Sequence, residues 1–152
     1  MKWESYDWNN HVRKVEVHRP KYAVVPDILS ECQLSQALSK AEELEPYCSK
    51  VIIVPKVHGI ISQIPDKYVI GISIVTRYSG FRLNDKELIG RRIHLLGGTP
   101  NQQKAIWYRL NNVQAVVKSL DCNSHILVSN FGKFWDGEKW RKENNGEYLG
   151  KY

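Results

Sequence analysis

Short apolar runs recur along the chain, and in most of them the apolar residues are consecutive rather than alternating. Strands of this kind are buried on both faces, and parallel sheets are where such strands usually occur. Helical segments between the runs favour the same arrangement, because strand, helix and strand in succession imply parallel pairing. We therefore expect an α/β fold with a mostly parallel sheet of about five strands, at residues 22–25, 51–54, 68–75, 93–96 and 113–117.

Two of the connections begin with residues that start a helix. Ser30 and Gln33 match an S-x-x-Q capping box between two leucines that can form a hydrophobic staple, and apolar residues then recur at helical spacing as far as Pro46. The segment GGTPNQ at 97–102 is a glycine turn followed by a T-x-x-Q box with proline at the first helical position. We expect a helix after each box, the second one short and ended by the asparagines at 111–112.

The chain of 152 residues is long enough to bury one core without disulfide or metal support, so we expect a single α/β domain over residues 1–152. Residues 1–20 form a helical lead-in, with a helix over 8–18 that Pro20 ends. Residues 131–152 form a tail rich in Trp, Gly and Asn. No repeat or linker divides the chain.

Charge and cysteine content limit the partners and the compartment. A formal net charge of +6 and a pI near 9.2 describe a surface that attracts polyanions, so nucleic acid is the leading candidate partner and solubility alone is the alternative. The three cysteines lack C-x-x-C spacing, which favours a reduced, cytoplasmic protein without disulfides or zinc, and we expect no cofactor. No run is long enough for a membrane span and no signal peptide is present, so we expect no membrane partner.

Polar residues gather where the predicted strands end. In a parallel sheet the loops after the carboxyl ends of the strands share one rim, and ligands bind there. The set contains carboxylates, imidazoles, a lysine, an arginine and a glycine turn, which suits an anionic or nucleoside-like ligand. Its members are Asp27; Lys56 and His58; Ser73, Thr76 and Arg77; Gly97, Gly98 and Thr99; and Asp121, Cys122, Asn123, Ser124 and His125.

Several of these residues also have a structural interpretation. Asp27 can act in a turn or on a helix dipole, and Asp121 can be an N-cap. The turn over 97–99 can bind phosphate or serve only as a turn. Lys56 can pair with Asp27 or Asp121 across the rim, or lie on the surface after Pro55.

Histidines and tryptophans elsewhere are open to the same two interpretations. His94 lies inside a predicted strand, where a satisfied core histidine is commoner than a ligand, and the histidine spacing fits no metal motif. Trp107 and Trp135 fit packing roles. Trp140, which precedes an arginine and a lysine, can pack or can stack on nucleic acid.

The order of short motifs along the chain resembles that of known proteins. The motifs are RPKYAVVPDI, VIIVPK, YVIGIS, RIHLLGGTP, VVKSLDCNSH and FWDGEKW, and they span about residues 19–141. They are similar to those of a small group of phage and archaeal proteins of unassigned function. More distantly, the order resembles the later part of the guanine transglycosylase barrel, whose members exchange guanine for a deazapurine in transfer RNA or in DNA. That family has a (β/α)₈ barrel, an aspartate nucleophile, a second aspartate that holds the base and commonly a zinc site.

The resemblance implies a partial or minimal (β/α) barrel and a phage-type protein of the host cytoplasm that acts on a guanine or deazapurine base in nucleic acid. By position, Asp121 matches the nucleophile, Asp27 the base-recognising aspartate, and the segment 71–72 the strand end that faces the base. The nucleophile would form a covalent glycosyl–enzyme intermediate that an incoming base resolves. The implied base-binding residues are Asp27, Lys56, Gly71, Ile72 and Ser73, and the phosphate-binding or rim residues are Arg77, Gly97, Gly98, Thr99, Asn123 and His125.

The chain also departs from that family. It supplies about five of the eight βα units of such a barrel. It lacks the early strand with the second catalytic carboxylate, has Pro55 and Lys56 where the family has a base-contacting glutamine, and lacks the zinc cysteines. We expect Asp27 and Asp121 to emerge side by side from neighbouring strands. The alternative function is a non-catalytic module that binds a nucleotide or nucleic acid, as a phage accessory or anti-host protein. A homodimer that protects the open sheet edges is a further expectation.

Overall fold

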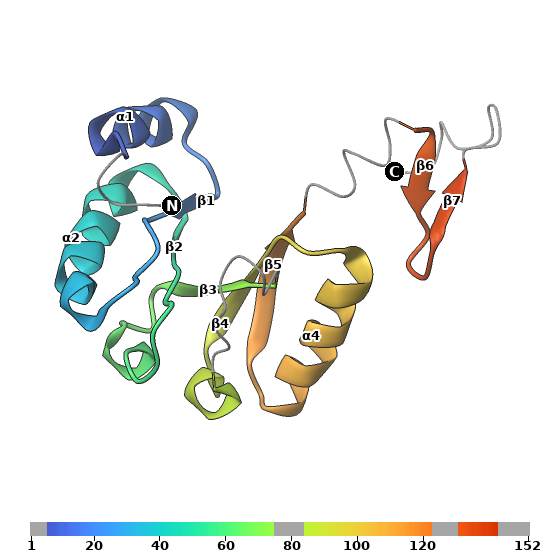
Figure 1. Cartoon of the computed structure of the whole chain (residues 1–152). Coiled ribbons are helices and arrows are strands. Elements are labelled where there is room, and N and C mark those ends of the chain that lie inside the picture. Colours follow the sequence, from blue (N-terminus) through green and yellow to red (C-terminus); the bar gives the residue numbers. More distant parts are fainter. Residues whose placement is uncertain (1–5, 75–83, 123–130, 143–152) are drawn as a thin grey trace.

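A parallel sheet of five strands forms the centre of the molecule (Figure 1). The computed structural model describes residues 6–74, 84–122 and 131–142. The spatial order of the strands follows the chain and every neighbouring pair is parallel, so the sheet winds in one direction, as in a barrel. It curls into a half-barrel, which confirms the predicted α/β fold and its partial-barrel form. The strands are β1 (Tyr22–Val24), β2 (Lys50–Ile53), β3 (Val69–Ser73), β4 (Arg92–Leu96) and β5 (Val116–Asp121).

The helices of the described residues are α1 (Trp8–His18), α2 (Leu34–Leu44) and α4 (Pro100–Asn112). Both predicted capping boxes are present. In the second, the Thr99 hydroxyl accepts from the Gln102 N–H, and Gln102 Oε1 accepts from the Thr99 N–H at 2.8 Å. The expectation of a short second helix is wrong, because α4 has 13 residues and includes the asparagines at 111–112. The first box is followed by a 3₁₀ turn, η2 (Glu31–Gln33), before α2 begins.

The two faces of the sheet are packed differently. Val51 and Ile53 of β2 lie in the main core together with Ala37 of α2 and Leu110 of α4. Successive residues of a strand point to opposite faces. The helices therefore cover one face, here called the outer face, and leave the inner face of the half-barrel to a small separate cluster of Ile52, Val54 and Val69.

The inner face is narrow because the sheet curls. The ring of Tyr22 on β1 lies 6.1 Å from the ring of His94 on β4, although β2 and β3 separate these strands in the sheet. On β3, a Cβ atom added to Gly71 would come within 2.7 Å of Val54 Cγ2 and 3.1 Å of Leu96 Cδ1. The lack of a side chain at Gly71 therefore lets its neighbours close over β3.

The last strand of the sheet begins later than the segment 113–117 that the sequence predicts. Val113 caps the end of α4, and Gln114 takes a left-handed φ of 60° in the turn that follows, so the first strand residue is Val116. β5 is an edge strand with alternating exposure, which a search for continuous apolar runs does not detect. Asp121, expected in the loop after the strand, is its last residue.

A bulge in β5 decides which of its side chains face inward. His94 pairs with Ser119, whereas the residue before His94 pairs with Val117, so Lys118 is an extra residue in the strand. Regular pairing would place Ser119 on the outer face. With the bulge, Ser119 and Asp121 both lie on the inner face beside His94.

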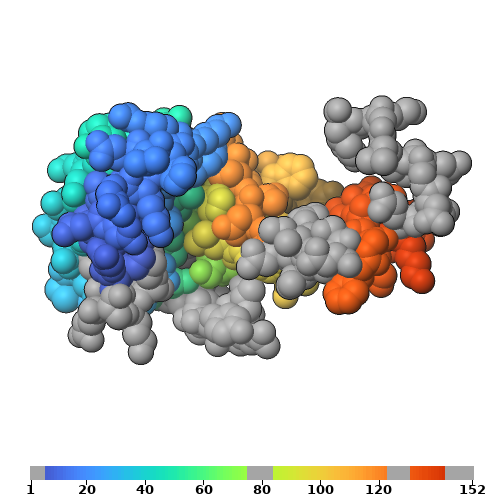
Figure 2. Space-filling model, turned by 90° about the horizontal axis from the view of Figure 1, so that it is seen from above, coloured from blue at the N-terminus to red at the C-terminus, as the bar shows by residue number. Residues whose placement is uncertain are grey.

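The predicted tail contains a two-stranded antiparallel hairpin, β6 (Lys133–Trp135) and β7 (Trp140–Lys142), which the sequence did not predict. Asp136 shapes its turn, because Asp136 Oδ1 accepts from the backbone N–H groups of Glu138 and Lys139. The hairpin lies at the end of the molecule farthest from α1 and α2, in Figure 1 and also from above in Figure 2.

Short 3₁₀ turns complete the described part of the chain: η3 (Glu45–Tyr47), η4 (Ile61–Gln63) and η5 (Asp85–Leu88). Over residues 6–74, 84–122 and 131–142, no helix has the length and apolar character that crossing a bilayer requires.

Adding a methyl group at Gly71 is expected to destabilise the fold, because Val54 and Leu96 occupy the space it needs. Gly71→Ala should lower the free energy of unfolding by about 1–3 kcal/mol, the usual cost of overpacking. Shortening Val54 removes the nearest atom, so Val54→Ala should cost less in the Gly71→Ala protein than in the wild type. Urea denaturation of the four proteins of this double-mutant cycle measures the coupling, and strictly additive costs would contradict the close approach.

Candidate functional site

The residues predicted at the strand ends form two separate groups on the rim. The first lies beyond β1, β2 and β3 and is centred on Lys56, and the second lies at the ends of β4 and β5 and is centred on Asp121. Predicted residues that lie outside the described ranges are Thr76, Arg77, Asn123, Ser124 and His125.

Lys56 joins the ends of three strands. Its backbone N–H donates to the Ile28 carbonyl, which extends the pairing of β1 and β2 past their last residues. Its Nζ donates to Ser73 Oγ at the end of β3 and lies 3.9 Å from Asp27 Oδ2, which confirms the predicted pairing of Lys56 with Asp27. The Lys56 side chain is 11% exposed, and burial lowers its pKa while the charge of Asp27 opposes that shift. An ammonium group and a carboxylate are thus held side by side at the rim.

Asp121 is fixed by the neighbouring strand β4. The Gly97 N–H donates to Asp121 Oδ1 at 2.8 Å, and His94 Nε2 lies 3.5 Å from Asp121 Oδ2. Gly97 has a φ of 69°, a left-handed conformation that glycine adopts without strain. The Asp121 side chain nevertheless remains 61% exposed. The result is an accessible carboxylate with one oxygen held by the main chain.

His94 connects Asp121 to Ser119. Its side chain is only 8% exposed, and Nδ1 lies 2.7 Å from Ser119 Oγ. Nδ1 thus shares a hydrogen bond with the Ser119 hydroxyl, while Nε2 faces the Asp121 carboxylate. This confirms that His94 is a satisfied core histidine, and it adds a contact with Asp121 that sequence reasoning missed. The only signal was the spacing of Ser119 and Asp121, which puts both on one face of a strand.

Gln103 fixes the spacing between the ends of β4 and β5. Its Nε2 donates to the Gly97 carbonyl at 3.0 Å and to the Asp121 carbonyl at 2.6 Å. It lies in the first turns of α4 and is 4% exposed. Sequence reasoning missed this residue as well, and a polar side chain on the buried stripe of an otherwise amphipathic helix was its only trace.

Backbone donors of the glycine turn are already used within the chain. The Gly97 N–H binds Asp121 and the Thr99 N–H binds Gln102. Gly98 also has a positive φ, of 79°. These contacts favour the structural interpretation of the turn, in which its backbone positions Asp121, over phosphate binding by the N–H groups of Gly97 and Thr99.

Asp27 and Asp121 do not follow neighbouring strands, so that expectation is wrong. They lie at or beyond the carboxyl ends of β1 and β5, which are the two edges of the sheet. Apolar runs do not encode the order of strands in a sheet. The curl of the sheet partly offsets the separation of β1 from the far strands, because a side chain of β1 reaches one of β4 across the inner face.

Of the three residues of β3 that were predicted to bind the base, only one contacts the charged groups at the rim. The Ile72 side chain belongs to the main core on the outer face. Val54 and Leu96 lie so close to Gly71 that they block contact between a base and this residue from the inner face. Ser73, two residues farther along β3 on the same face, is the β3 side chain that contacts Lys56.

The cysteines and acidic residues within the described ranges do not assemble into a cluster. Among the residues that the structure describes, no three His, Cys, Asp or Glu side chains are placed as metal ligands. Cys32, Cys48 and Cys122 are free thiols.

The fold and the rim define the molecule as an α/β half-barrel protein with a charged site at the carboxyl ends of its strands. The chain belongs to a family of unknown function, DUF6610, whose model matches residues 1–150. The matched range includes the sheet, its helices and the hairpin. No curated protein and no solved structure matches the chain.

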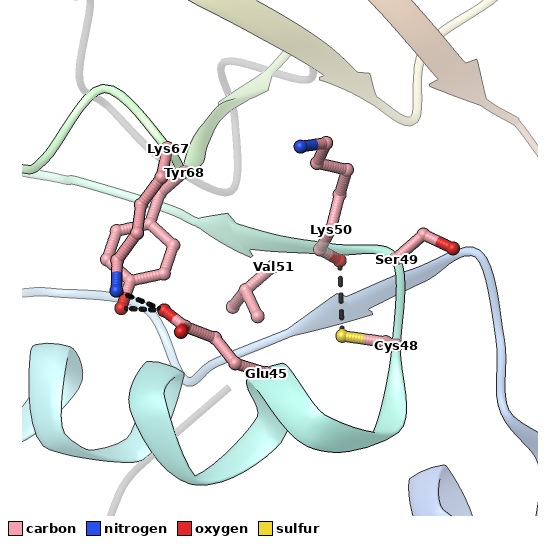
Figure 3. Close-up of a pocket in the computed structure, with 7 residues that line it drawn as sticks. All are labelled: Glu45, Cys48, Ser49, Lys50, Val51, Lys67 and Tyr68. Carbon is pink, nitrogen blue, oxygen red and sulfur yellow. Dashed lines mark hydrogen bonds and ion pairs between the residues drawn. The ribbon is translucent and has the colours of Figure 1, made fainter.

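A polar pocket of ≈ 220 Å³ lies at the opposite, amino end of β2 and β3 (Figure 3). Figure 3 shows Lys67 and Tyr68 pointing together at Glu45. Tyr68 Oη donates to Glu45 Oε1 at 2.6 Å, and Lys67 Nζ pairs with the same oxygen. Lys67 and then Tyr68 lower the pKa of Glu45, while burial and then Glu45 raise the pKa of Tyr68 to about 12. These contacts tie the turn after α2 to the start of β3, so we interpret the pocket as structural.

The Tyr68 contact predicts a loss of stability at alkaline pH. Its ordinary pKa is 10.0 and its pKa in the folded chain is about 12, so the unfolded chain loses its proton first. The stabilising contribution is complete below about pH 10 and is lost as the pH rises towards 12. Tyr68→Phe should flatten this part of the decline, whereas Tyr108→Phe, at a 56% exposed tyrosine, should not. Urea denaturation from about pH 9 to about pH 12 measures both variants, and equal declines would contradict the assignment.

Proposed function

We propose that the protein transfers a glycosyl group at a guanine-type base in nucleic acid, with Asp121 as the nucleophile. One observation carries the proposal: the Asp121 carboxylate is exposed, yet it is fixed at the carboxyl end of a parallel strand by the Gly97 N–H and lies beside His94. The motif LDC that contains Asp121, and the order of the motifs around it, resemble those of guanine transglycosylases. The half-barrel form of the sheet agrees with that resemblance.

The reaction needs a positioned carboxylate at the sugar. Asp121 Oδ2 attacks C1′ of the target nucleoside as the glycosidic bond breaks, which gives a covalent glycosyl–enzyme ester and a departing base that takes up a proton. The incoming base gives up a proton, attacks the same carbon and releases the carboxylate. The hydrogen bond from Gly97 holds Oδ1 and leaves Oδ2 to form the ester, and His94 with its proton on Nε2 would stabilise the negative charge that returns when the ester breaks.

The Asp27 and Lys56 pair supplies groups that match guanine. The Watson–Crick edge of guanine has N–H donors at N1 and N2 beside the acceptor O6, and a flipped base is recognised along that edge. Asp27 can accept from both donors while Lys56, 3.9 Å away, donates to O6. The hydrogen bond to Ser73 keeps the ammonium group in place. Adenine has an acceptor at N1 and would face the Asp27 carboxylate unfavourably.

A non-catalytic module that binds a nucleotide or nucleic acid is the second candidate. It is favoured by the sheet of five strands, which is short of the eight strands of a full barrel, and by the net charge of +6. The two candidates differ in turnover, because only the first requires the Asp121 carboxylate. A homodimer through the open edges β1 and β5 stays a prediction for either candidate.

Exchange of labelled guanine into RNA and DNA with unpaired guanines tests the first candidate. Asp121→Asn should abolish exchange, by about 10³-fold or more, and abolish the covalent adduct seen on a denaturing gel. Asp27→Asn should mainly raise the KM for the base, because that residue is assigned to recognition. Glu42→Gln, an exposed charge change on α2, is the matched control and should leave turnover unaltered.

Circular dichroism of each variant confirms that the fold is retained. Unchanged turnover in Asp121→Asn would remove the nucleophile assignment. Absence of exchange by the wild type, together with a thermal shift on adding guanine or a nucleotide, would favour the binding module instead.

A further inference from the structure

A second hollow lies between α4, the edge strand β5 and the β6–β7 hairpin. It is an open groove of ≈ 620 Å³, within the size range of ligand sites. Figure 1 shows α4 lying along β5, with the hairpin beyond them at the end of the molecule. The residues of the groove that matter here are Lys104, Trp107, Lys118, Leu120 and Trp135.

The groove combines exposed aromatic surface with positive charge. Trp107 is 51% exposed and stacks on Tyr108 with ring centres 5.7 Å apart, and Leu120 is 52% exposed. Lys104 and Lys118 are exposed, and the described residues that line the groove include no aspartate or glutamate. α4 itself also carries no acidic residue. Aromatic planes flanked by cations are the pattern that binds bases together with phosphates.

We propose that this groove binds a single-stranded segment of nucleic acid. Bases stack on Trp107 and Trp135, and Lys104 and Lys118 contact the phosphates. A neutral apolar partner would leave both lysines unused, whereas a polyanion complements them and the net charge of +6.

The groove extends to the candidate site. Ser119, whose hydroxyl binds His94, and Gln103, whose amide binds the Asp121 carbonyl, both belong to its lining. A strand that follows the groove therefore arrives beside Asp121 at the end of β5. The inference rests on the proposed function and deepens it, because it gives the substrate class as unpaired nucleic acid and gives the surface that holds it.

Fluorescence anisotropy with a labelled oligonucleotide of about ten mixed bases, as DNA and as RNA, measures binding to the full chain. Trp107→Ala should weaken binding by about 5- to 150-fold, the effect of removing one stacking aromatic side chain. Phe131→Ala removes a 78% exposed aromatic side chain that does not line the groove, and it should leave the affinity within about twofold of the wild type.

Salt dependence tests the lysines. Each lost phosphate contact should reduce the slope of log K against log salt by about 0.7, so Lys104→Gln with Lys118→Gln should reduce it by about 1.4. Arg13→Gln with Lys14→Gln removes the same charge from exposed positions on α1 and should leave the slope unaltered. Equal changes in the two pairs would mean general attraction to polyanions and would overturn the inference.

The remaining outcomes are also decisive. Comparison of the DNA and RNA arms identifies the bound nucleic acid, and failure of the wild type to bind either overturns the inference, as does full affinity in Trp107→Ala. A wild-type dimer in sedimentation that Trp107→Ala converts to a monomer would instead mark the groove as a contact between copies. A wild-type protein that binds the oligonucleotide but does not exchange guanine would retain the groove and overturn the chemistry, so failure of the groove and failure of the chemistry are distinguishable.

Discussion

Burial of the outer face of the sheet beneath the helices is the constraint on which the rest of the molecule depends. Parallel strands need crossover connections, and the helices in those connections need an apolar face to pack on. Here Val51 and Ile93 of the sheet belong to one hydrophobic core with Ala37 of α2 and Leu110 of α4. Because that face is used for packing, the charged groups of the candidate site, Asp27, Lys56 and Asp121, lie at the rim. The apolar residues that stabilise the fold and the charged residues of the candidate site therefore lie on different parts of the sheet.

The inner face limits where a ligand can lie. The ring of Tyr22 reaches across to a side chain of β4, and apolar neighbours close over Gly71, so side chains occupy these parts of the inner face. A ligand must therefore approach from the carboxyl ends of the strands. It would meet Lys56 and Asp27, where partial burial strengthens the charge interaction, and the exposed carboxylate of Asp121.

Local features of the structure could be predicted from the sequence, and the long-range contacts could not. The boxes at Ser30 and Thr99 located helix starts because capping is decided within one turn of chain. Continuous apolar runs located β1 to β4 because burial on both faces leaves a compositional signal. The contact of Asp121 with His94 depends instead on strand order and register, which no local pattern carries. For the same reason the sequence placed Asp27 on the correct rim but beside the wrong strand.

The pairing of β5 with β4 makes the place of Asp121 depend on the length of β5, in which Lys118 is the extra residue. A substitution in β5 alters a single side chain, and deletion of Lys118 would restore regular pairing with Ser119 still opposite His94. Deletion of a residue between Lys118 and Asp121 would instead move Asp121 out of register with Leu96 and turn it towards the helices. Loops elsewhere tolerate insertions and deletions at little cost. The position of the Asp121 carboxylate therefore depends on the number of residues in β5 as well as on the residue at position 121.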